Sequence, residues 1–294
     1  MKTRIFDFTI MGGDQRQVWL ARLLADRGFR ICQYELPEGL PKDQYPLCSC
    51  TEEALTCSSF ILAPLPLSSH IFSIPVSEFS SFLSEDQIFF AGKIPSCFRD
   101  PATKQGIPFF DYMEDESLTL YNTIATAEGV VTLAALNSPR NLHKSQCLVL
   151  GYGKCGRRLA ALLTGMFCHV TVCARNPAAL TEASLSVPQV IDFSSLPDAL
   201  EHATFDFIFN TIPAPVFGKA CLRLLNSQTA IFDIASAPGG IDFASAAQLG
   251  ISARLCPGLP GKYAPLSSAQ AMEKMILSHI APSVPQNKKI SERK

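Results

Sequence analysis

The stretch Cys147–Ala160, CLVLGYGKCGRRLA, decides the fold of this 294-residue chain. The four apolar residues Cys147–Leu150 are typical of a buried strand, and a glycine turn and then a helix-length segment follow them directly. Gly151, Gly153 and Gly156 have dinucleotide spacing: the first permits the tight turn, the second lets a pyrophosphate approach the backbone, and the third lets the helix pack on the strand. The following helix N-terminus offers N–H groups to phosphates. The stretch predicts nucleotide binding; a turn that only closes a strand–helix corner is the alternative.

The end of the next expected strand indicates which nucleotide binds. An NAD site usually places an acid about 20 residues after the turn, where it holds the ribose diol. The sequence HVTVCARNP instead puts Ala174, Arg175 and Asn176 at that place. An arginine fork pairs with a 2′-phosphate and stacks on adenine. The sequence therefore favours NADP over NAD, the alternative being a surface arginine that caps the strand end.

Three further loops follow expected strands, in FDFIFNTIPA, DIASAPGGID and LCPGLPGKYAP. Ligands of doubly wound sheets lie beyond the carboxyl ends of the strands, although the last two loops are equally well explained as turns with special backbone angles. From its position in the glycine turn, Cys155 is expected to block coenzyme entry when it carries a bulky adduct. The predicted cofactor-binding residues are Gly151, Gly153, Lys154, Cys155, Gly156, Arg175, Asn176, Asn210, Thr211, Ile212, Pro213, Pro257 and Gly258.

Short apolar runs alternate with helix-length segments along the whole chain, which is typical of α/β folds with parallel sheets. The expected strands of the second half include Cys147–Leu150 and Phe205–Asn210. In the first half, a helix from about Gln15 to Arg27 is expected to end at Gly28, where a glycine can take the left-handed conformation. We predict two Rossmann-like domains with a cleft between them and the cofactor in the second. The expected parts are a substrate domain at 1–116, an interdomain helix and linker at 117–140, an NADP-binding domain at 141–266, a helix at about 267–281 that packs back onto the first domain, and a flexible tail at 282–294.

Composition excludes several classes of protein. Apolar residues make up 47% and charged residues 17%, too little charge for a disordered chain or a coiled coil. The net charge of −1 provides no basic field for nucleic acid or an anionic membrane. No run approaches the roughly 18 apolar residues of a membrane span, and no signal peptide is recognisable. We expect a cytoplasmic protein.

The 11 cysteines form no CxxC pair. Cys48, Cys50 and Cys57 could be combined into a thiolate metal cluster, but no histidine or fourth cysteine stands at ligand spacing. Buried, reduced thiols that fill space like small apolar residues are the favoured interpretation. The sequence therefore predicts no metal site.

In the first domain, MGGDQRQ places Gly12, Gly13, Asp14 and Arg16 at a strand-to-helix turn without the three-glycine spacing. A second dinucleotide is therefore not expected. A turn with bare N–H groups beside an arginine suits a carboxylate, because bidentate pairing fixes its orientation. Asp14 acting only as a helix N-cap stays an open alternative.

The segment YNTIATAEGVV carries Asn122, Thr123 and Glu128 on a helix that is apolar nearly all round. Such a helix is expected to be buried between layers or domains. A carboxylate on it must be paired, protonated or placed at a cleft, and we favour the cleft for Glu128.

Six segments, MGGDQRQ, YNTIATAEGVV, VLGYGKCGRRLA, FNTIPA, DIASAPGGIDF and CPGLPGKYAP, occur in an order that resembles the dipicolinate synthase A subunits of spore-forming bacteria. The resemblance runs from about Ile5 to Met275. It implies an NADP-dependent oxidation of a dihydrodipicolinate to pyridine-2,6-dicarboxylate for sporulation, in the mother-cell cytoplasm. It also implies a partner, the second, flavoprotein-like B subunit; a homo-oligomer is left open.

For this small dicarboxylate, Arg16 is the expected partner of a substrate carboxylate, and the loop at 257–261 is expected to place the ring. Glu128 or Asp14 would take the ring proton. Two alternatives remain: an NADP-binding partner subunit without its own chemistry, and an NADP-dependent oxo- or hydroxy-acid reductase, although no histidine lies near the predicted ligand turns. The predicted substrate-binding residues are Gly13, Asp14, Arg16, Asn122 and Thr123.

Overall fold

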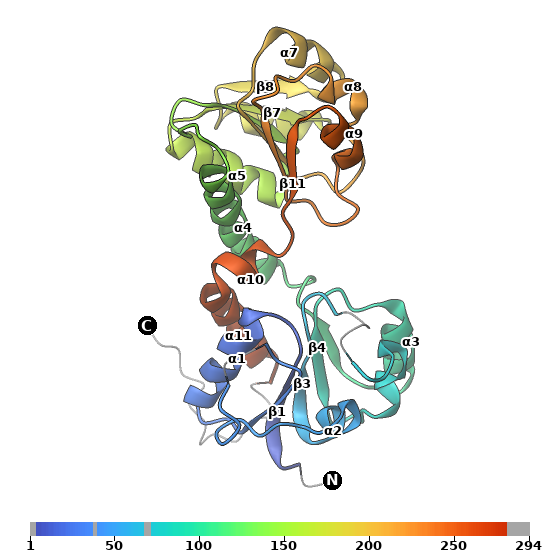
Figure 1. Cartoon of the computed structure of the whole chain (residues 1–294). Coiled ribbons are helices and arrows are strands. Elements are labelled where there is room, and N and C mark those ends of the chain that lie inside the picture. Colours follow the sequence, from blue (N-terminus) through green and yellow to red (C-terminus); the bar gives the residue numbers. More distant parts are fainter. Residues whose placement is uncertain (1–3, 38–39, 68–71, 281–294) are drawn as a thin grey trace. The chain divides into compact units, whose positions relative to one another are not determined.

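A computed structural model describes residues 4–37, 40–67 and 72–280 of the chain (Figure 1). The predicted tail at 282–294 lies outside the described residues. The chain divides into two compact units. Unit 1 consists of Met1–Tyr121 and Ala264–Lys294, and unit 2 of Asn122–Tyr263. Among the described residues, no helix has the length and apolar character needed to cross a membrane.

Unit 1 contains a five-stranded parallel sheet with the order β2-β1-β3-β4-β5. Its first strand continues into a helix, and the expected end of that helix is confirmed: α1 stops at Asp26, and Gly28 adopts φ +86°. The strands are β1 (Phe6–Met11), β2 (Ile31–Tyr34), β3 (Ser58–Leu62), β4 (Ile88–Ala91) and β5 (Phe109–Asp111).

Helices cover both faces of this sheet, as parallel sheets require. One face packs on α1 (Gln15–Asp26) and α11 (Pro265–Ile280), which contact each other and share a buried apolar cluster. The other face packs on α2 (Thr51–Thr56), the 3-10 helix η2 (Val76–Ser81) and α3 (Ser96–Lys104). An ion pair of 2.6 Å between Arg27 Nε and Glu273 Oε1 links α1 to α11.

Unit 2 contains a six-stranded parallel sheet with the order β11-β10-β9-β6-β7-β8. Counted along this unit, the order is 6-5-4-1-2-3, which is that of a dinucleotide-binding doubly wound sheet. The prediction of two parallel-sheet α/β domains is thus confirmed. The strands are β6 (Gln146–Leu150), β7 (His169–Ala174), β8 (Gln189–Asp192), β9 (Phe207–Asn210), β10 (Ala230–Asp233) and β11 (Ser252–Leu255).

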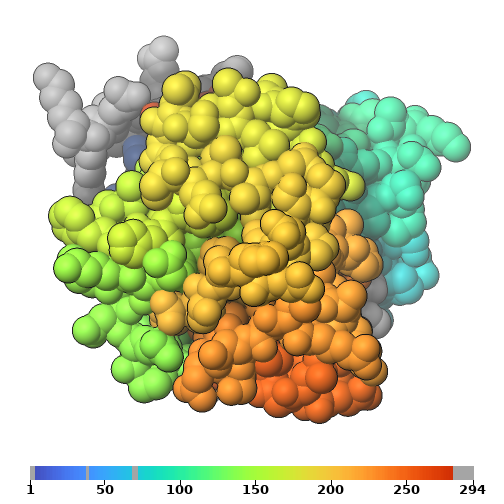
Figure 2. Space-filling model, turned by 90° about the horizontal axis from the view of Figure 1, so that it is seen from above, coloured from blue at the N-terminus to red at the C-terminus, as the bar shows by residue number. Residues whose placement is uncertain are grey.

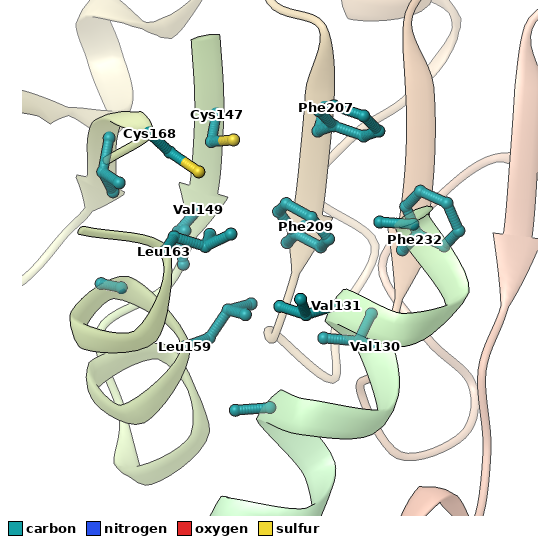
Figure 3. Packing of buried hydrophobic residues seen from close by; sticks show 14 of the residues in the cluster. Val130, Val131, Cys147, Val149, Leu159, Leu163, Cys168, Phe207, Phe209 and Phe232 are labelled. Carbon is teal, nitrogen blue, oxygen red and sulfur yellow. The ribbon is translucent and has the colours of Figure 1, made fainter. Parts of the chain in front are cut away.

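Alternation along β6 divides the core of unit 2 into two layers. Cys147 and Val149 face α4 (Glu116–Leu136) and α5 (Lys154–Gly165), whose Val130, Val131 and Leu159 pack over the strands (Figure 3). Leu148 and Leu150 face the opposite layer, which contains α7 (Leu196–His202), α8 (Lys219–Leu222) and α9 (Phe243–Gln248). The surface that unit 2 presents is coloured from green through yellow to orange in Figure 2.

Three elements differ from the sequence expectations. The expected loop at 257–261 is helical from Leu259 on, where α10 (Leu259–Tyr263) begins. The helix α4 is not apolar all round, because Leu120, Glu128 and Leu136 are exposed on it. The edge strand β8 was not expected, since Gln189–Asp192 contains only two apolar residues. The remaining short helices are α6 (Pro177–Ser184) and the 3-10 helix η3 (Phe193–Ser195).

Candidate functional site

The glycine turn of unit 2 joins β6 to α5. Gly151 adopts φ +93°, a left-handed conformation that favours glycine. A Cβ on Gly156 would lie 2.2 Å from the carbonyl oxygen of Gly151, so only glycine allows α5 to approach the end of β6 this closely. The first and third glycines are therefore required by the fold itself.

Gly153 has a different role. It is the N-cap of α5, no side chain caps this helix, and a Cβ on Gly153 would meet no heavy atom within 4 Å. Open space thus lies over the first N–H groups of a 12-residue helix. A pyrophosphate accepts hydrogen bonds from such groups and is attracted by the helix dipole. The residues present fit a dinucleotide.

The loop after β7 carries no acid at 174–176, as the sequence shows. Asn176 caps α6, accepting a hydrogen bond of 2.9 Å from Ala178 N through Oδ1, so its side chain is already engaged. Arg175 is exposed, and its guanidinium forms no ion pair within the described part of the chain. A guanidinium at this position is available to a phosphate on the ribose.

The ends of β9 and β10 are joined by a buried polar network that sequence reasoning missed in part. Asn210 Nδ2 donates to Asp233 Oδ1 (2.8 Å), and the carboxylate of Asp233 also accepts from Ala235 N (2.9 Å) and Gly240 N (2.7 Å). Both side chains are fully buried. The signal was available, because Asp233 is the first polar residue after the apolar run of β10 in the sequence AIFDIASAPGG. This network fixes the loops beyond two neighbouring strands.

Thr211 packs against the glycine turn from the end of β9. Its hydroxyl donates to Leu150 O (2.9 Å), and a Cβ on Gly151 would lie 2.6 Å from Thr211 Oγ1 and 2.8 Å from a carbon of Ile212. The pairing of β6 with β9 thus brings the predicted residues of the two loops together. Pro213, Pro257 and Gly258 are exposed beyond β9 and β11 on the same carboxyl edge.

Two residues at the start of α5 lie within the turn. Lys154 is exposed. Cys155 is half-buried, and burial raises the pKa of its thiol. A raised pKa reduces the thiolate fraction at neutral pH and therefore the rate of alkylation. The adduct expected at Cys155 would form slowly.

The corresponding turn of unit 1 is closed by a side chain. Asp14 is the N-cap of α1 and accepts from Arg16 N (3.0 Å). The same carboxylate pairs with the buried Arg16 guanidinium through Nε (2.9 Å to Oδ1) and Nη2 (2.8 Å to Oδ2). Arg16 Nη2 also donates to Leu65 O (2.8 Å). The structure thus shows that Asp14 caps the helix, a role that the sequence left open. The Asp14 carboxylate also occupies part of the Arg16 guanidinium, which was expected to bind substrate.

Hydrogen-bonding capacity is left unused near Arg16. Gln17 Nε2 donates to Ala63 O (2.9 Å), while Gln17 Oε1 is buried and has no partner among the described residues. The hydroxyl of Tyr112, the residue after β5, is fully buried and likewise lacks a partner there. Burial raises the pKa of Tyr112, although the Arg16 charge acts against it. Sequence reasoning missed both residues: Gln17 ends the segment MGGDQRQ but was not singled out there, and Tyr112 belongs to no recognisable motif.

The other predicted substrate residues lie on α4, in unit 2. Asn122 Oδ1 is buried without a partner in the described part of the chain, and Thr123 is buried. Glu128 is exposed. The argument that its carboxylate must be paired, protonated or at a cleft assumed a buried helix and therefore no longer applies. The residues expected to bind substrate are therefore divided between the units: Gly13, Asp14 and Arg16 in unit 1, and Asn122 and Thr123 in unit 2.

Comparisons with known proteins agree with this architecture. Residues 7–113 match the family model of the N-terminal domain of the dipicolinate synthase A subunit. Over 169 residues the chain is 34% identical to the A subunit of dipicolinate synthase from Bacillus subtilis (strain 168), an alignment that spans 57% of this chain and 56% of that protein's length. The chain thus covers little more than half of this curated relative in sequence.

The fold extends the likeness to nearly the whole chain. The crystal structure of the dipicolinate synthase A subunit from Bacillus halodurans superposes with a TM-score of 0.80 at 25% identity, covering 95% of this chain and 98% of the other. D-lactate dehydrogenase from Escherichia coli shares the fold alone, with a TM-score of 0.62 at 12% identity over 97% of this chain and 100% of the other. The chain has a dehydrogenase-like fold, its residues 7–113 match the N-terminal domain of dipicolinate synthase A subunits, and its whole fold is similar to that of a dipicolinate synthase A subunit.

Proposed function

We propose that the chain is an NADP-dependent oxidoreductase, the A subunit of a dipicolinate synthase, which oxidises a dihydrodipicolinate to dipicolinate. The observation that carries the proposal is the coenzyme edge of unit 2: an uncapped helix N-terminus beneath the open Gly153, with Arg175 where NAD sites hold an acid. The names of the family's proteins supply the substrate class.

The residues of unit 2 act by binding and orienting. The first N–H groups of α5 hold the pyrophosphate, and Arg175 pairs with the 2′-phosphate. The Asn210–Asp233 network keeps the loops after β9 and β10 in place, so these loops need little reorganisation when the nicotinamide ring binds. NADP⁺ supplies the hydride acceptor, and aromatisation of the product ring favours the forward direction.

For the dicarboxylate, Arg16 is the proposed partner, with Asp14 holding its guanidinium in a fixed orientation. Each turnover releases one ring proton besides the transferred hydride. Asp14 and Glu128 stay predictions as its acceptor. Asp14 is the weaker candidate, because both of its carboxylate oxygens already accept hydrogen bonds from Arg16.

The remaining features of the family are proposals for this chain as well. The relative from Bacillus subtilis carries the name of one lettered subunit of a synthase, which supports a partner chain. We propose that this partner is the flavoprotein-like B subunit, that the complex works during sporulation, and that it does so in the mother-cell cytoplasm.

Coenzyme selectivity tests the proposal directly. Calorimetric titration of the full chain should show tighter binding of NADPH than of NADH. Arg175→Asp should weaken NADPH binding at least tenfold, about 1.4 kcal/mol, without weakening NADH binding. Arg223→Asp, at an exposed arginine that ends α8, is the matched control and should change neither affinity. Equal loss of both coenzymes in Arg175→Asp would contradict the NADP assignment.

Activity requires a second measurement. The chain, alone and with the B subunit, is supplied with a dihydrodipicolinate source and NADP⁺, and dipicolinate is followed by its ultraviolet absorbance. Formation of dipicolinate together with an equal amount of NADPH supports the proposed oxidation. NADPH binding without any turnover, even with B present, would reduce the chain to a coenzyme-holding partner.

A further inference from the structure

Three thiols from separate segments of unit 1 converge on one face of its sheet. Cys32 lies on β2, Cys48 in the loop before α2, and Cys57 at the C-terminal cap of α2. Their sulfur atoms all lie within 4.8 Å of one another; Cys57 Sγ is 3.3 Å from Cys32 Sγ and 3.7 Å from Cys48 Sγ. The sequence-based alternative grouped Cys50 with two of them. That grouping is wrong, because Cys50 Sγ caps α2 by accepting from Glu53 N (3.4 Å).

Backbone contacts, and not the thiols themselves, hold this arrangement. The loop before α2 is fixed to β2 by hydrogen bonds from Gln33 N to Pro46 O and from Cys48 N to Gln33 O, both 2.9 Å. The N–H of Cys57 closes the last turn of α2 on Glu53 O (3.0 Å), and β3 begins at the next residue. The three sulfurs therefore lie close together before any ligand binds.

The distances suit a metal ion with thiolate ligands. A Zn–S bond of about 2.3 Å in tetrahedral geometry places sulfurs about 3.8 Å apart. The observed 3.7 Å matches this, and 3.3 Å requires only a small rotation of a side chain. Thr9 Oγ1 lies 3.2 Å from Cys32 Sγ and 3.3 Å from Cys57 Sγ, which places an oxygen beside two of the three sulfurs. Ser58 Oγ, 2.7 Å from this hydroxyl, is positioned to orient it.

Charge and access distinguish between ions. Cys32 and Cys48 are buried, whereas Cys57 is half-buried and leaves an entry path. Thiolates prefer soft ions such as Zn²⁺ and Cu⁺. With three thiolates, a divalent ion leaves one net negative charge in this buried place and a monovalent ion leaves two, so the divalent ion is favoured.

We propose that Cys32, Cys48 and Cys57 bind one Zn²⁺ ion, with Thr9 as the neighbouring oxygen. The ion would tie β2, the loop before α2 and the end of α2 together. Each thiol that is still protonated releases its proton on binding, so affinity should fall as the pH is lowered. The site lies on the face of the sheet covered by α2 and α3 and does not depend on the proposed coenzyme site.

Cobalt titration of the reduced, metal-free full chain is the primary test. Co²⁺ should bind with a stoichiometry of one per chain and give a thiolate-to-cobalt charge-transfer band with the intense visible bands of a tetrahedral ion, and Zn²⁺ should displace it. Cys57→Ser and Cys32→Ser should abolish these bands. Cys168→Ser is the matched control, since Cys168 lies beside Cys147 in unit 2 and should retain them. Absence of the bands in the wild type, or unchanged bands in Cys57→Ser, overturns the proposal.

Thiol counting provides a test that needs no variant. When the reduced wild-type chain is saturated with Zn²⁺, Cys57 should become protected from a thiol-specific reagent, because it is the one thiol of the three that is not already buried. Zn²⁺ should also raise the midpoint of thermal unfolding, because it binds only the folded arrangement. An unchanged number of reactive thiols would overturn the proposal even if the serine variants failed to fold.

Discussion

In both units the first strand leads into a helix, but the two helices begin with different N-cap residues. In unit 2, β6 leads into a helix whose N-cap is Gly153, so the first N–H groups of α5 are left for a ligand. In unit 1, β1 leads into a helix whose N-cap is Asp14, and this carboxylate takes an N–H group and pairs with Arg16. The Asp14 carboxylate thus takes the place at the start of α1 where a phosphate would accept from the first N–H groups. One residue type at the N-cap therefore separates a nucleotide turn from a turn that is already satisfied.

The polar groups at the two carboxyl edges differ in a second way. In unit 2, Asn210 and Asp233 satisfy each other and the surrounding backbone. In unit 1, Gln17 Oε1 and the Tyr112 hydroxyl are buried without partners among the described residues. An unsatisfied buried group costs stability, whereas a satisfied network confers rigidity. The carboxyl edge of unit 2 is thus rigid, whereas unsatisfied polar groups near Arg16 reduce the stability of unit 1.

Removal of the satisfied network should have the largest effect. Asp233→Ala leaves Asn210 Nδ2 and the N–H groups of Ala235 and Gly240 without their acceptor. Because each such buried donor costs about 1–3 kcal/mol, we expect a loss of about 3 kcal/mol or more in the free energy of unfolding. Urea unfolding followed by circular dichroism measures it. Asp198→Ala, at an exposed acid of α7, is the control. A similar midpoint in both variants would show that the network is not structural.

The glycine turn allows binding to be separated from stability. Gly153→Ala meets no atom in the structure and should leave the fold intact, while its methyl group stands where the pyrophosphate approaches. We expect at least a tenfold loss of NADPH affinity, about 1.4 kcal/mol, by calorimetry. Gly165→Ala, at the other end of α5 and also in open space, should bind NADPH normally. Unchanged affinity in Gly153→Ala would place the pyrophosphate elsewhere.

Local patterns explain how much of this could be foreseen. The glycine spacing, the apolar runs of β6 and β9, and Gly28 as a helix stop are local signals, and they predicted the elements to within a few residues. Edge strand β8 escaped because half of its residues are polar. The Asp233 network and the grouping of Cys32 with Cys57 depend on strand order and loop packing, which no single stretch encodes.

A stability gain should result from the unpaired hydroxyl of unit 1. Tyr112→Phe removes a buried O–H that has no partner in the described part of the chain, so the free energy of unfolding should rise by about 1 kcal/mol. Thermal unfolding measures the gain, and binding of dipicolinate to the full chain is followed in parallel. Tyr45→Phe is a comparison for the loss of a hydroxyl elsewhere in unit 1. Destabilisation by Tyr112→Phe would mean that the hydroxyl has a partner in solution.

The smallest expected effect concerns two aspartates, one in each unit, and the difference between them is the salt dependence of their contribution to stability. A hydrogen bond from Arg4 lowers the pKa of Asp86 in unit 1 to about 2, whereas the pKa of Asp192 in unit 2 is lowered by hydrogen bonds from the neutral Ser194. Since the folded-state pKa of Asp86 is depressed, its stabilisation is complete above about pH 4 and is lost as the pH falls toward 2.

Arg4→Ala should therefore flatten the fall in stability between pH 4 and pH 2. The difference should stay below about 1 kcal/mol, because the Asp86 side chain is 37% exposed and solvent screens the pair. High salt should reduce the difference further, whereas Ser194→Ala should have a salt-independent effect. Acid titrations of unfolding at low and high ionic strength measure both. An acid limb of Arg4→Ala that coincides with the wild type at low salt would show that the Arg4–Asp86 pair contributes nothing, and the contrast between charge-assisted and neutral support in the two units would fail with it.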